Sequence, residues 1–285
     1  MEIKLCAFAD EYSSSLDEQI KGLRENNIYY IELRGVDGKN ITAWDVEDAV
    51  NWKKKLSEGD IKVWSIGSPL GKVKLSDSWE DHLATAEKLF KMANILECQN
   101  VRMFSFFTSQ YERDAETVFS RLCEMKALAD KYGVTLCHEN EKGVFGDNAE
   151  RCLDLLKRVD GLKNVFDPAN YVQCSQDIPA ALALLSDKTY YYHIKDALYA
   201  DGSVVPAGKG DGHLEKMISE ITCDTVLTLE PHLRVFDGYS EIDSSGLKNK
   251  YTYASAQNAF AAAVNALKDI LKKLGFTEEN RAWKK

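Results

Sequence analysis

Four residues whose side chains commonly bind divalent metal ions recur at regular intervals in the second half of the chain. Glu139, Asp167, His193 and Glu230 each lie at or near the end of a short run rich in apolar and β-branched residues, and 28, 26 and 37 residues separate them. One strand-and-helix unit takes roughly 30 residues in an eightfold barrel of about 250 residues. The spacing therefore predicts that the four side chains meet at one rim of such a barrel.

The chemistry of these residues indicates a bound cation. Side chains alternate between the two faces of a strand, so Glu139 shares a face with Cys137, and Glu230 shares one with Val226. Carboxylates at the inward ends of apolar strands are costly to bury without a compensating positive charge. Each residue alone would be an ordinary solvated rim residue, but three carboxylates and one imidazole together predict a divalent metal site. Oxygen-rich ligands favour Mn²⁺, with Mg²⁺, Co²⁺ and Zn²⁺ as alternatives.

Two residues lie one layer closer to the expected mouth of the barrel than the ligands. Lys195 follows His193 on the same strand face, where it would either polarise a substrate oxygen or form a salt bridge with a rim carboxylate. His232 has the same relation to Glu230, and would either act as an acid or base toward a substrate or pack beneath Phe236. The sequence leaves both alternatives open for each residue.

Three more polar residues are candidates for substrate contacts. Glu32 and Arg34 share one face of an early strand, where an ion pair between them would either position a substrate or stabilise the barrel. His213 begins a short helical segment, and the sequence does not separate a capping role from a substrate-binding role.

The segments that must position these residues alternate between short β-rich runs and longer runs with helical periodicity. The predicted strands cover residues 3–9, 29–34, 62–66, 100–104, 134–139, 164–167, 190–195 and 225–230. The predicted helices cover residues 14–26, 43–58, 76–96, 115–132, 149–159, 178–186, 213–220 and 255–274. Eight strands that are each followed by a helix predict an α/β fold, the (β/α)₈ TIM barrel. The main competing fold, an open doubly wound sheet, is disfavoured because no glycine-rich dinucleotide-binding turn follows the first strand.

Two long segments, residues 196–212 and 231–253, follow the last two predicted strands and are expected at the mouth of the barrel. The chain contains no internal repeat beyond the strand-and-helix unit and no linker rich in proline or serine. We therefore expect residues 1–285 to form a single domain.

Composition and charge exclude several classes of protein. With 45% hydrophobic and 28% charged residues, the 285-residue chain is neither disordered nor a small disulfide-stapled protein. The formal net charge of −9 disfavours general affinity for nucleic acid. The seven cysteines include no C-x-x-C pair, which is typical of reduced thiols in a cytoplasmic protein. Neither a signal peptide nor an apolar run of about 18 residues is found, so we expect no membrane association.

Six short motifs occur in a consistent order along nearly the whole chain. They are Ile31-Glu-Leu-Arg34, His138-Glu-Asn140, Phe166-Asp-Pro168, Tyr192-His-Ile-Lys-Asp196, Pro206-Ala-Gly-Lys-Gly210 and Leu229-Glu-Pro231. In order and spacing they resemble the xylose isomerase-like TIM-barrel superfamily, which includes sugar and sugar phosphate isomerases and epimerases, inosose dehydratases and endonuclease IV. The resemblance places the metal-binding Glu, Asp, His and Glu of that superfamily at Glu139, Asp167, His193 and Glu230.

The resemblance implies an isomerase or epimerase that removes a proton next to a carbonyl. In such enzymes a divalent metal binds the substrate carbonyl and an adjacent hydroxyl and stabilises the enediolate that forms, while two glutamates act as base and acid. Here those catalytic roles would belong to Glu139 and Glu230, and the sequence does not show which of them removes the proton. The expected partner is a small carbohydrate or cyclitol, and homo-oligomerisation is left open.

Other reactions and roles are compatible with parts of this pattern. Phe145 and Tyr199 replace a Glu and an Arg that hold the substrate in related keto-sugar epimerases, which argues against a free keto-hexose. An inosose-type dehydratase, or an enzyme that eliminates the aglycone of a 3-keto glycoside, would begin with the same proton abstraction. The intact ligand set argues against a non-catalytic sugar-binding subunit. Asn170, which stands where endonuclease IV carries a histidine, argues with the net charge against a repair enzyme.

Overall fold

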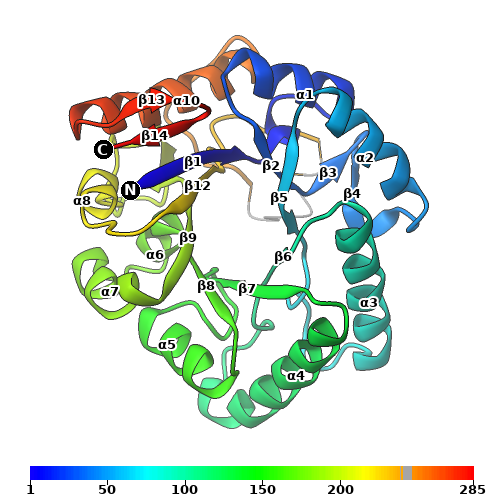
Figure 1. Cartoon of the computed structure of the whole chain (residues 1–285). Helices are drawn as coiled ribbons and strands as arrows, with labels where there is room; N and C mark the ends of the chain where they lie inside the picture. Colours follow the sequence, from blue (N-terminus) through cyan, green and yellow to red (C-terminus); the bar gives the residue numbers. More distant parts are fainter. Residues whose placement is uncertain (238, 240–245) are drawn as a thin grey trace.

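Eight parallel strands form the barrel of this computed structural model, which describes residues 1–237, 239 and 246–285 (Figure 1). In chain order these strands are β1 (Glu2–Ala7), β2 (Tyr30–Leu33), β5 (Lys62–Gly67), β6 (Asn100–Met103), β7 (Thr135–Glu139), β8 (Lys163–Phe166), β9 (Thr189–Ile194) and β12 (Thr225–Leu229). Strand β12 returns to pair with β1, from Ile3 opposite Thr225 to Ala7 opposite Leu229. The sheet is therefore closed, which confirms the predicted (β/α)₈ barrel.

Helices surround the barrel and connect its strands. Eight of them match the predicted helical segments to within five residues at each end: α1 (Leu16–Glu25), α2 (Asp48–Glu58), α3 (Trp79–Ile95), α4 (Tyr111–Lys131), α5 (Ala149–Arg158), α7 (Ile178–Leu185), α8 (Leu214–Ser219) and α10 (Ala256–Lys273). Short 3-10 turns add η1 (Ala9–Glu11), η2 (Ile41–Ala43) and η3 (Ser186–Lys188). Within the part of the chain that the structure describes, no helix is long and apolar enough to cross a membrane.

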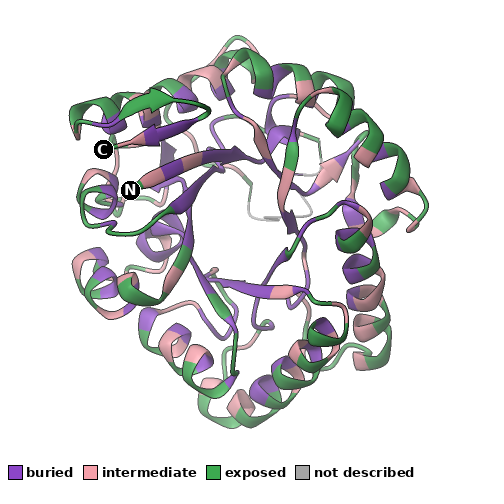
Figure 2. Cartoon of the chain, viewed as in Figure 1, coloured by how far each residue is buried: buried purple, intermediate pink, exposed green. Residues whose placement is uncertain are grey.

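The hydrophobic residues pack in two layers. The larger cluster lies between the strands and the helices, and the outer helix faces are exposed (Figure 2). The smaller cluster fills the inside of the barrel with Cys6, Cys137, Val165, Tyr191 and Val226. The strand alternation predicted Cys137 and Val226 to be on this inner face, and their packing together confirms it.

A short helix, α6 (Pro168–Gln173), follows β8 directly and was not predicted. The Asp167 side chain caps it by accepting a hydrogen bond from the Asn170 backbone amide, and Pro168 occupies the first turn. Asp followed by Pro is a favoured pair at a helix start because the carboxylate binds a free amide and proline lacks one. A metal-ligand candidate is thereby held at a fixed backbone position.

The segment of residues 196–212 forms a hairpin of β10 (Asp196–Ala197) and β11 (Val204–Val205) followed by a glycine-rich turn. The buried Asp196 carboxylate accepts backbone hydrogen bonds of 2.9 Å from Gly208, Gly210 and Gly212. A Cβ atom at Gly210 or Gly212 would lie only 2.4 or 2.7 Å from Asp196 Oδ1, so the close approach requires glycine there. In the second long segment, residues 238 and 240–245 lie outside the described residues.

Two further hairpins are attached to the barrel. The first, β3 (Gly35–Val36) and β4 (Lys39–Asn40), follows β2, and the second, β13 (Thr277–Glu279) and β14 (Ala282–Lys284), ends the chain. Strand β2 pairs with β1 only at Cys6 and Ala7, and β14 pairs antiparallel with the start of β1 at Glu2 and Ile3. The last hairpin thus extends the sheet beside β1, where the two ends of the chain meet (Figure 1).

Candidate metal centre

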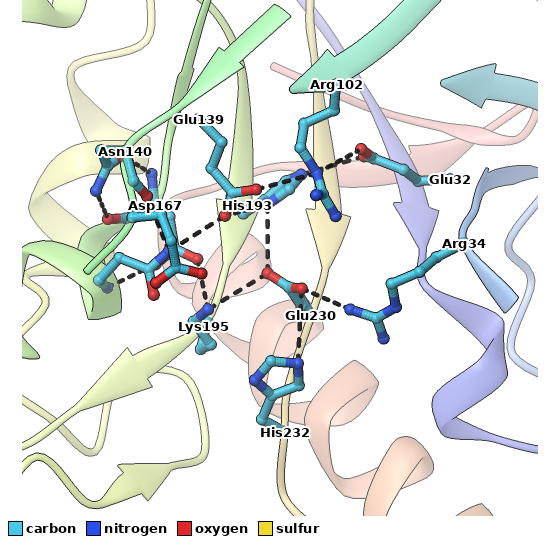
Figure 3. Close-up of polar contacts among 12 residues, drawn as sticks. Glu32, Arg34, Arg102, Glu139, Asn140, Asp167, His193, Lys195, Glu230 and His232 are labelled. Carbon is cyan, nitrogen blue, oxygen red and sulfur yellow. Dashed lines mark hydrogen bonds and ion pairs between the residues drawn. The ribbon is translucent and has the colours of Figure 1, made fainter. Parts of the chain in front are cut away.

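The four predicted ligands converge at the carboxyl ends of four adjacent strands. Glu139 ends β7, Asp167 follows β8, His193 lies in β9 and Glu230 follows β12. All four are buried, and one ligand atom from each lies within 4.8 Å of the others (Figure 3). The structure therefore contains a cluster of side chains that could hold a metal ion.

Strand tilt explains why residues at different register positions reach the same point. Glu139 of β7 pairs with Val165 of β8, and the ligand candidate of β8, Asp167, lies two residues later. His193 of β9 pairs with Thr228 of β12, and Glu230 again lies two residues later. Strands in a barrel tilt and shift relative to one another, so side chains at one height come from progressively later register positions.

The His193 imidazole lies between carboxylate groups, where it could bind a metal ion. Its Nε2 atom lies 3.2 Å from Glu32 Oε2, while Nδ1 lies 3.1 Å from Glu139 Oε1 and 3.3 Å from a Glu230 carboxylate oxygen. Among the described residues, Nδ1 has no well-formed hydrogen bond although it is buried. If Nε2 donates to Glu32, the Nδ1 lone pair faces carboxylate oxygens, and a cation between them would relieve the repulsion. The donor set therefore fits a divalent metal ion.

The local charges favour the same conclusion. Six carboxylates and three cationic side chains are buried in and around this cluster: Asp10, Glu11, Glu32, Glu139, Asp167 and Glu230 against Arg34, Arg102 and Lys195. Burial raises the pKa of Asp167 to about 7, although the Lys195 ammonium opposes this shift. Burial likewise raises the pKa of Glu11 to about 8. Carboxylates therefore outnumber the lysine and arginine side chains in this cluster, and a divalent cation would stabilise their charged forms.

The cations each contact a candidate ligand. Lys195 Nζ lies 2.9 Å from Asp167 Oδ2 and 3.4 Å from Glu230 Oε2. Burial raises the pKa of Glu230, but the Lys195 ammonium and its other cationic neighbours outweigh burial and hold this pKa well below its usual range. Burial opposes protonation of His193 as well, but the Glu139 and Glu32 carboxylates raise its pKa well above the usual value.

Glu32 lies behind His193 instead of in the pocket, and it does not pair with Arg34 as expected. It accepts a hydrogen bond of 3.0 Å from the Tyr191 hydroxyl and faces His193 Nε2. Arg34 binds Asp10 with Nε and Nη2, at 2.8 and 2.9 Å, and donates from Nη1 to Glu230 at 2.7 Å. The two residues therefore act on different parts of the cluster: Glu32 orients the imidazole, and Arg34 anchors one carboxylate.

Because Glu32 fixes the orientation of His193, we expect Glu32→Gln to weaken metal binding about 10- to 100-fold, as loss of an outer-shell partner does. Titration of the metal-free protein with Mn²⁺ would measure this affinity. Tyr191→Phe removes the other hydrogen bond to Glu32 and leaves the contact with His193, so its effect is expected to be smaller. Unchanged affinity in Glu32→Gln would contradict the orienting role.

A small pocket with a cavity volume of about 30 Å³ lies above the cluster. It is lined by Arg34, Asn40, Gly67, Pro69, Lys72, Arg102, Phe104, Glu139, Glu141, Lys195, Glu230 and His232. Lys195 and His232 were both predicted to lie on the mouth side of the ligands, and both line this pocket. The His232 ring lies 5.8 Å from that of Phe236, and its Nε2 lies 3.6 Å from Glu230 Oε1. The packing against Phe236 is therefore observed, and the acid or base role toward a substrate stays a prediction.

His213 does not lie in this pocket. It is exposed, begins α8 with a left-handed backbone (φ 52°) and makes no side-chain capping hydrogen bond. It lines a separate surface depression with Gly208 and Gly210. The substrate-binding prediction for His213 is therefore not supported by its position, because α8 packs on the outside of the barrel.

The two residues that depart from the epimerase pattern also lie away from the pocket. Phe145 is buried against Phe119, with ring centroids 5.5 Å apart. The Tyr199 side chain is exposed, and its hydroxyl donates to the Gln176 carbonyl. Other residues must therefore hold a substrate in this chain.

Arg102 is the main residue of the site that the sequence analysis missed. Its Nε lies 3.1 Å from Glu139 Oε2 and 3.8 Å from Glu32 Oε1. The available signal in the sequence was a charged residue within an otherwise apolar strand end. In the structure Arg102 pairs in register with Cys137, which shares a strand face with Glu139.

Phe8 forms the floor beneath these charged groups. Its ring meets His193 edge-on at 5.2 Å, and the Arg34 and Arg102 guanidinium carbons lie 4.2 and 5.4 Å from its centroid. A Cβ atom at Gly67 would lie 2.4 Å from this ring, so a side chain there would displace it. The strand position next to Phe8 thus requires glycine.

Comparisons with known proteins agree with this geometry. Residues 20–275 match the family model described as xylose isomerase-like TIM barrel. The probable L-ribulose-5-phosphate 3-epimerase UlaE of Mycoplasma pneumoniae is 30% identical over 159 residues. That match covers 54% of this chain and 52% of UlaE, so about half the length of the curated relative is matched.

Solved structures show the same fold. A probable 3-DHS dehydratase, AsbF, involved in petrobactin synthesis in Bacillus anthracis, superimposes with a TM-score of 0.70 and 19% identity over 94% of this chain and 99% of its own. The IolI protein with a bound zinc atom superimposes with a TM-score of 0.72 and 18% identity over 95% and 99%. At these identities the similarity establishes the shared barrel.

Proposed function

Because the chain belongs to the family of xylose isomerase-like TIM barrels, we propose that it is a divalent-metal-dependent sugar or sugar phosphate isomerase or epimerase. The observation that carries this proposal is the cluster of Glu139, Asp167, His193 and Glu230, with one ligand atom from each within 4.8 Å of the others beneath a small pocket. The partial similarity to a probable sugar phosphate epimerase supports the reaction class.

Two glutamates face the pocket as an acid and base pair. Removal of a proton next to a carbonyl needs a base within hydrogen-bond reach of the carbon, and a return of the proton needs an acid. Glu139 and Glu230 both line the pocket, and their carboxylate oxygens lie 3.1 and 3.3 Å from His193 Nδ1. Lys195 contacts Glu230 and Asp167, which keeps it beside the reacting groups as a candidate donor to a substrate oxygen.

The bound ion would be held by the four clustered side chains, with Mn²⁺ as the first candidate and Mg²⁺, Co²⁺ or Zn²⁺ as alternatives. Such an ion supplies Lewis acidity, which makes a proton next to the carbonyl more acidic. The expected substrate is a small carbohydrate or cyclitol, and no nucleic acid partner is proposed. We place the activity in the cytoplasm.

A lyase is the second candidate function. Removal of the same proton followed by expulsion of a group from the neighbouring carbon would make the enzyme a dehydratase, or an enzyme that eliminates the aglycone of a 3-keto glycoside. The barrel it shares with a probable 3-DHS dehydratase keeps this candidate open. Phe145 and Tyr199, which lie outside the pocket, remove two contacts expected of a free keto-hexose epimerase.

Metal content and solvent exchange test the proposal together. The purified protein is expected to contain one divalent ion or to bind one on addition. Incubation in D₂O with ketoses, inososes and 3-keto glycosides should incorporate deuterium at the carbon next to the carbonyl of one class. Product with retained hydroxyl groups identifies an isomerase or epimerase, and loss of water or aglycone identifies a lyase. Failure to bind any divalent ion would reject the proposal and favour a non-catalytic barrel.

A further inference from the structure

We propose that Arg102 binds the substrate and stabilises the negative charge that forms on a substrate oxygen when Glu139 removes a proton. The inference rests on the proposed function, because it assigns a role in that reaction to a residue that the ligand set does not include. The contacts of the Arg102 guanidinium support this inference.

Two nitrogens of the Arg102 guanidinium contact the protein. Nε lies 3.1 Å from Glu139 Oε2, and Nη1 donates a hydrogen bond of 2.8 Å to the Ser68 carbonyl. The guanidinium carbon lies 4.6 Å from the centroid of the Phe104 ring. These contacts hold the charged group in place, and Figure 3 shows it beside Glu139, the proposed base.

The remaining nitrogen, Nη2, faces the pocket. Of the residues that the structure describes, none accepts a hydrogen bond from it. A Cβ atom at Gly67 would lie 3.4 Å from Nη2, and Gly67, Phe104 and Arg102 all line the pocket. The absence of a side chain at Gly67 thus leaves the two N–H groups of Nη2 open to a bound molecule.

Arg34, the other arginine that lines the pocket, has no nitrogen without a carboxylate partner among the described residues. Arg34 also lines the pocket, but all three of its nitrogens donate to carboxylates: Nε and Nη2 to Asp10, and Nη1 to Glu230. Arg34 therefore anchors Glu230, whereas Arg102 has unused donors next to Glu139.

The position of Arg102 matches the movement of charge in the reaction. When Glu139 takes the proton, the electron pair of the C–H bond forms a C=C bond, and the carbonyl oxygen gains the negative charge that the carboxylate loses. A guanidinium that touches the carboxylate and faces the pocket stays beside that charge throughout. Arginine remains protonated at ordinary pH, so it acts as a fixed cation and not as a proton donor. Loss of one such preorganised donor typically costs about 10²- to 10³-fold in rate.

Arg102→Ala in the metal-loaded protein is expected to lower the turnover of deuterium exchange about 100-fold or more, with a smaller change in KM. Added guanidinium ion should restore part of this rate. Arg102→Lys keeps the positive charge but loses the planar guanidinium with its several N–H donors, so it should retain intermediate activity. Arg121→Ala is the matched control, because its guanidinium lies over Trp79 outside the pocket. An Arg102→Ala rate within threefold of wild type would overturn the proposal, as would a loss that guanidinium does not restore.

A binding measurement decides the role independently of turnover. Glycolohydroxamate is a small oxyanion that resembles the enediolate, and analogues of this kind report on charge stabilisation. We expect its Kd to rise about 100-fold in Arg102→Ala and to stay unchanged in Arg121→Ala, with equal metal content in all three proteins. Equal Kd values would overturn the proposal. If the wild-type protein exchanges no substrate, the proposed function fails, while the hydroxamate titration still tests Arg102.

Discussion

Glu139→Gln is expected to abolish deuterium exchange into the substrate. The change keeps the size of the side chain and one oxygen for the metal, but removes the carboxylate that would accept the proton. Loss of a positioned general base typically costs about 10²- to 10⁴-fold, and ¹H NMR of the substrate in D₂O would follow the exchange directly.

The measurement must separate loss of the base from loss of the metal. Metal content should therefore be determined in the same samples, with the ion added in excess over the affinity of the variant. Glu116→Gln provides a matched control, because this carboxylate pairs with Arg158 on the outside of the barrel. Exchange that continues in metal-loaded Glu139→Gln would show that another group, with Glu230 as the first candidate, removes the proton.

Asp167→Asn is expected to reduce metal affinity by more than the 10- to 100-fold that loss of an outer-shell partner costs. Asn retains Oδ1, which caps α6, and asparagine is itself a good N-cap. It replaces Oδ2, which lies 2.9 Å from Lys195 Nζ, by an amide nitrogen that cannot bind a cation. The variant should therefore fold, bind metal poorly and lose exchange activity. Metal titration and thermal unfolding would measure both properties.

Asp177→Asn is the matched control for this change. Asp177 caps α7 through a hydrogen bond from the Ala180 amide and precedes a proline in the first turn, so its local role is the same. It has no place in the candidate metal centre, and its substitution should leave metal affinity unchanged. Asp167→Asn with an affinity within threefold of wild type would remove Asp167 from the ligand set.

The sequence predicted the barrel and the four clustered residues because both depend on regular patterns. Strand alternation and a spacing near one strand-and-helix unit suffice to bring Glu139, Asp167, His193 and Glu230 to one rim. The tilt of the strands, which the sequence does not show, sets the height of each residue, but it acts on all strands alike. The clustering of the four residues could therefore be predicted from the regular repeat of the fold.

The partners of each charged residue could not be predicted in this way. Glu32 and Arg34 share a strand face, yet Glu32 contacts His193, which lies 161 positions away, and Arg34 contacts Glu230. Such pairings depend on how side chains cross the barrel, and neither propensity nor periodicity encodes them. His213 lies outside the pocket for a related reason: the turn of residues 206–212 leads to the start of α8, and strand spacing gives no information about the path of a loop.

The final hairpin was missed because its strands are only three residues long and mainly polar. Thr277–Glu279 is exposed throughout, and Ala282 and Trp283 are buried only by docking beside β1. A strand of this kind is stabilised by the pairing that it completes, and the partner lies at the other end of the chain.

The position of Phe8 beneath two arginines has a consequence for how this site can evolve. A change at Phe8, or a side chain at Gly67, would shift the supports of Arg34 and Arg102 together, and with them the surroundings of both glutamates. Substitutions at residues that share a support are generally not additive. Epistasis is therefore built into this pocket: a replacement at one arginine would be tolerated or rejected according to what stands at the other, and new specificities would be reached through paired changes.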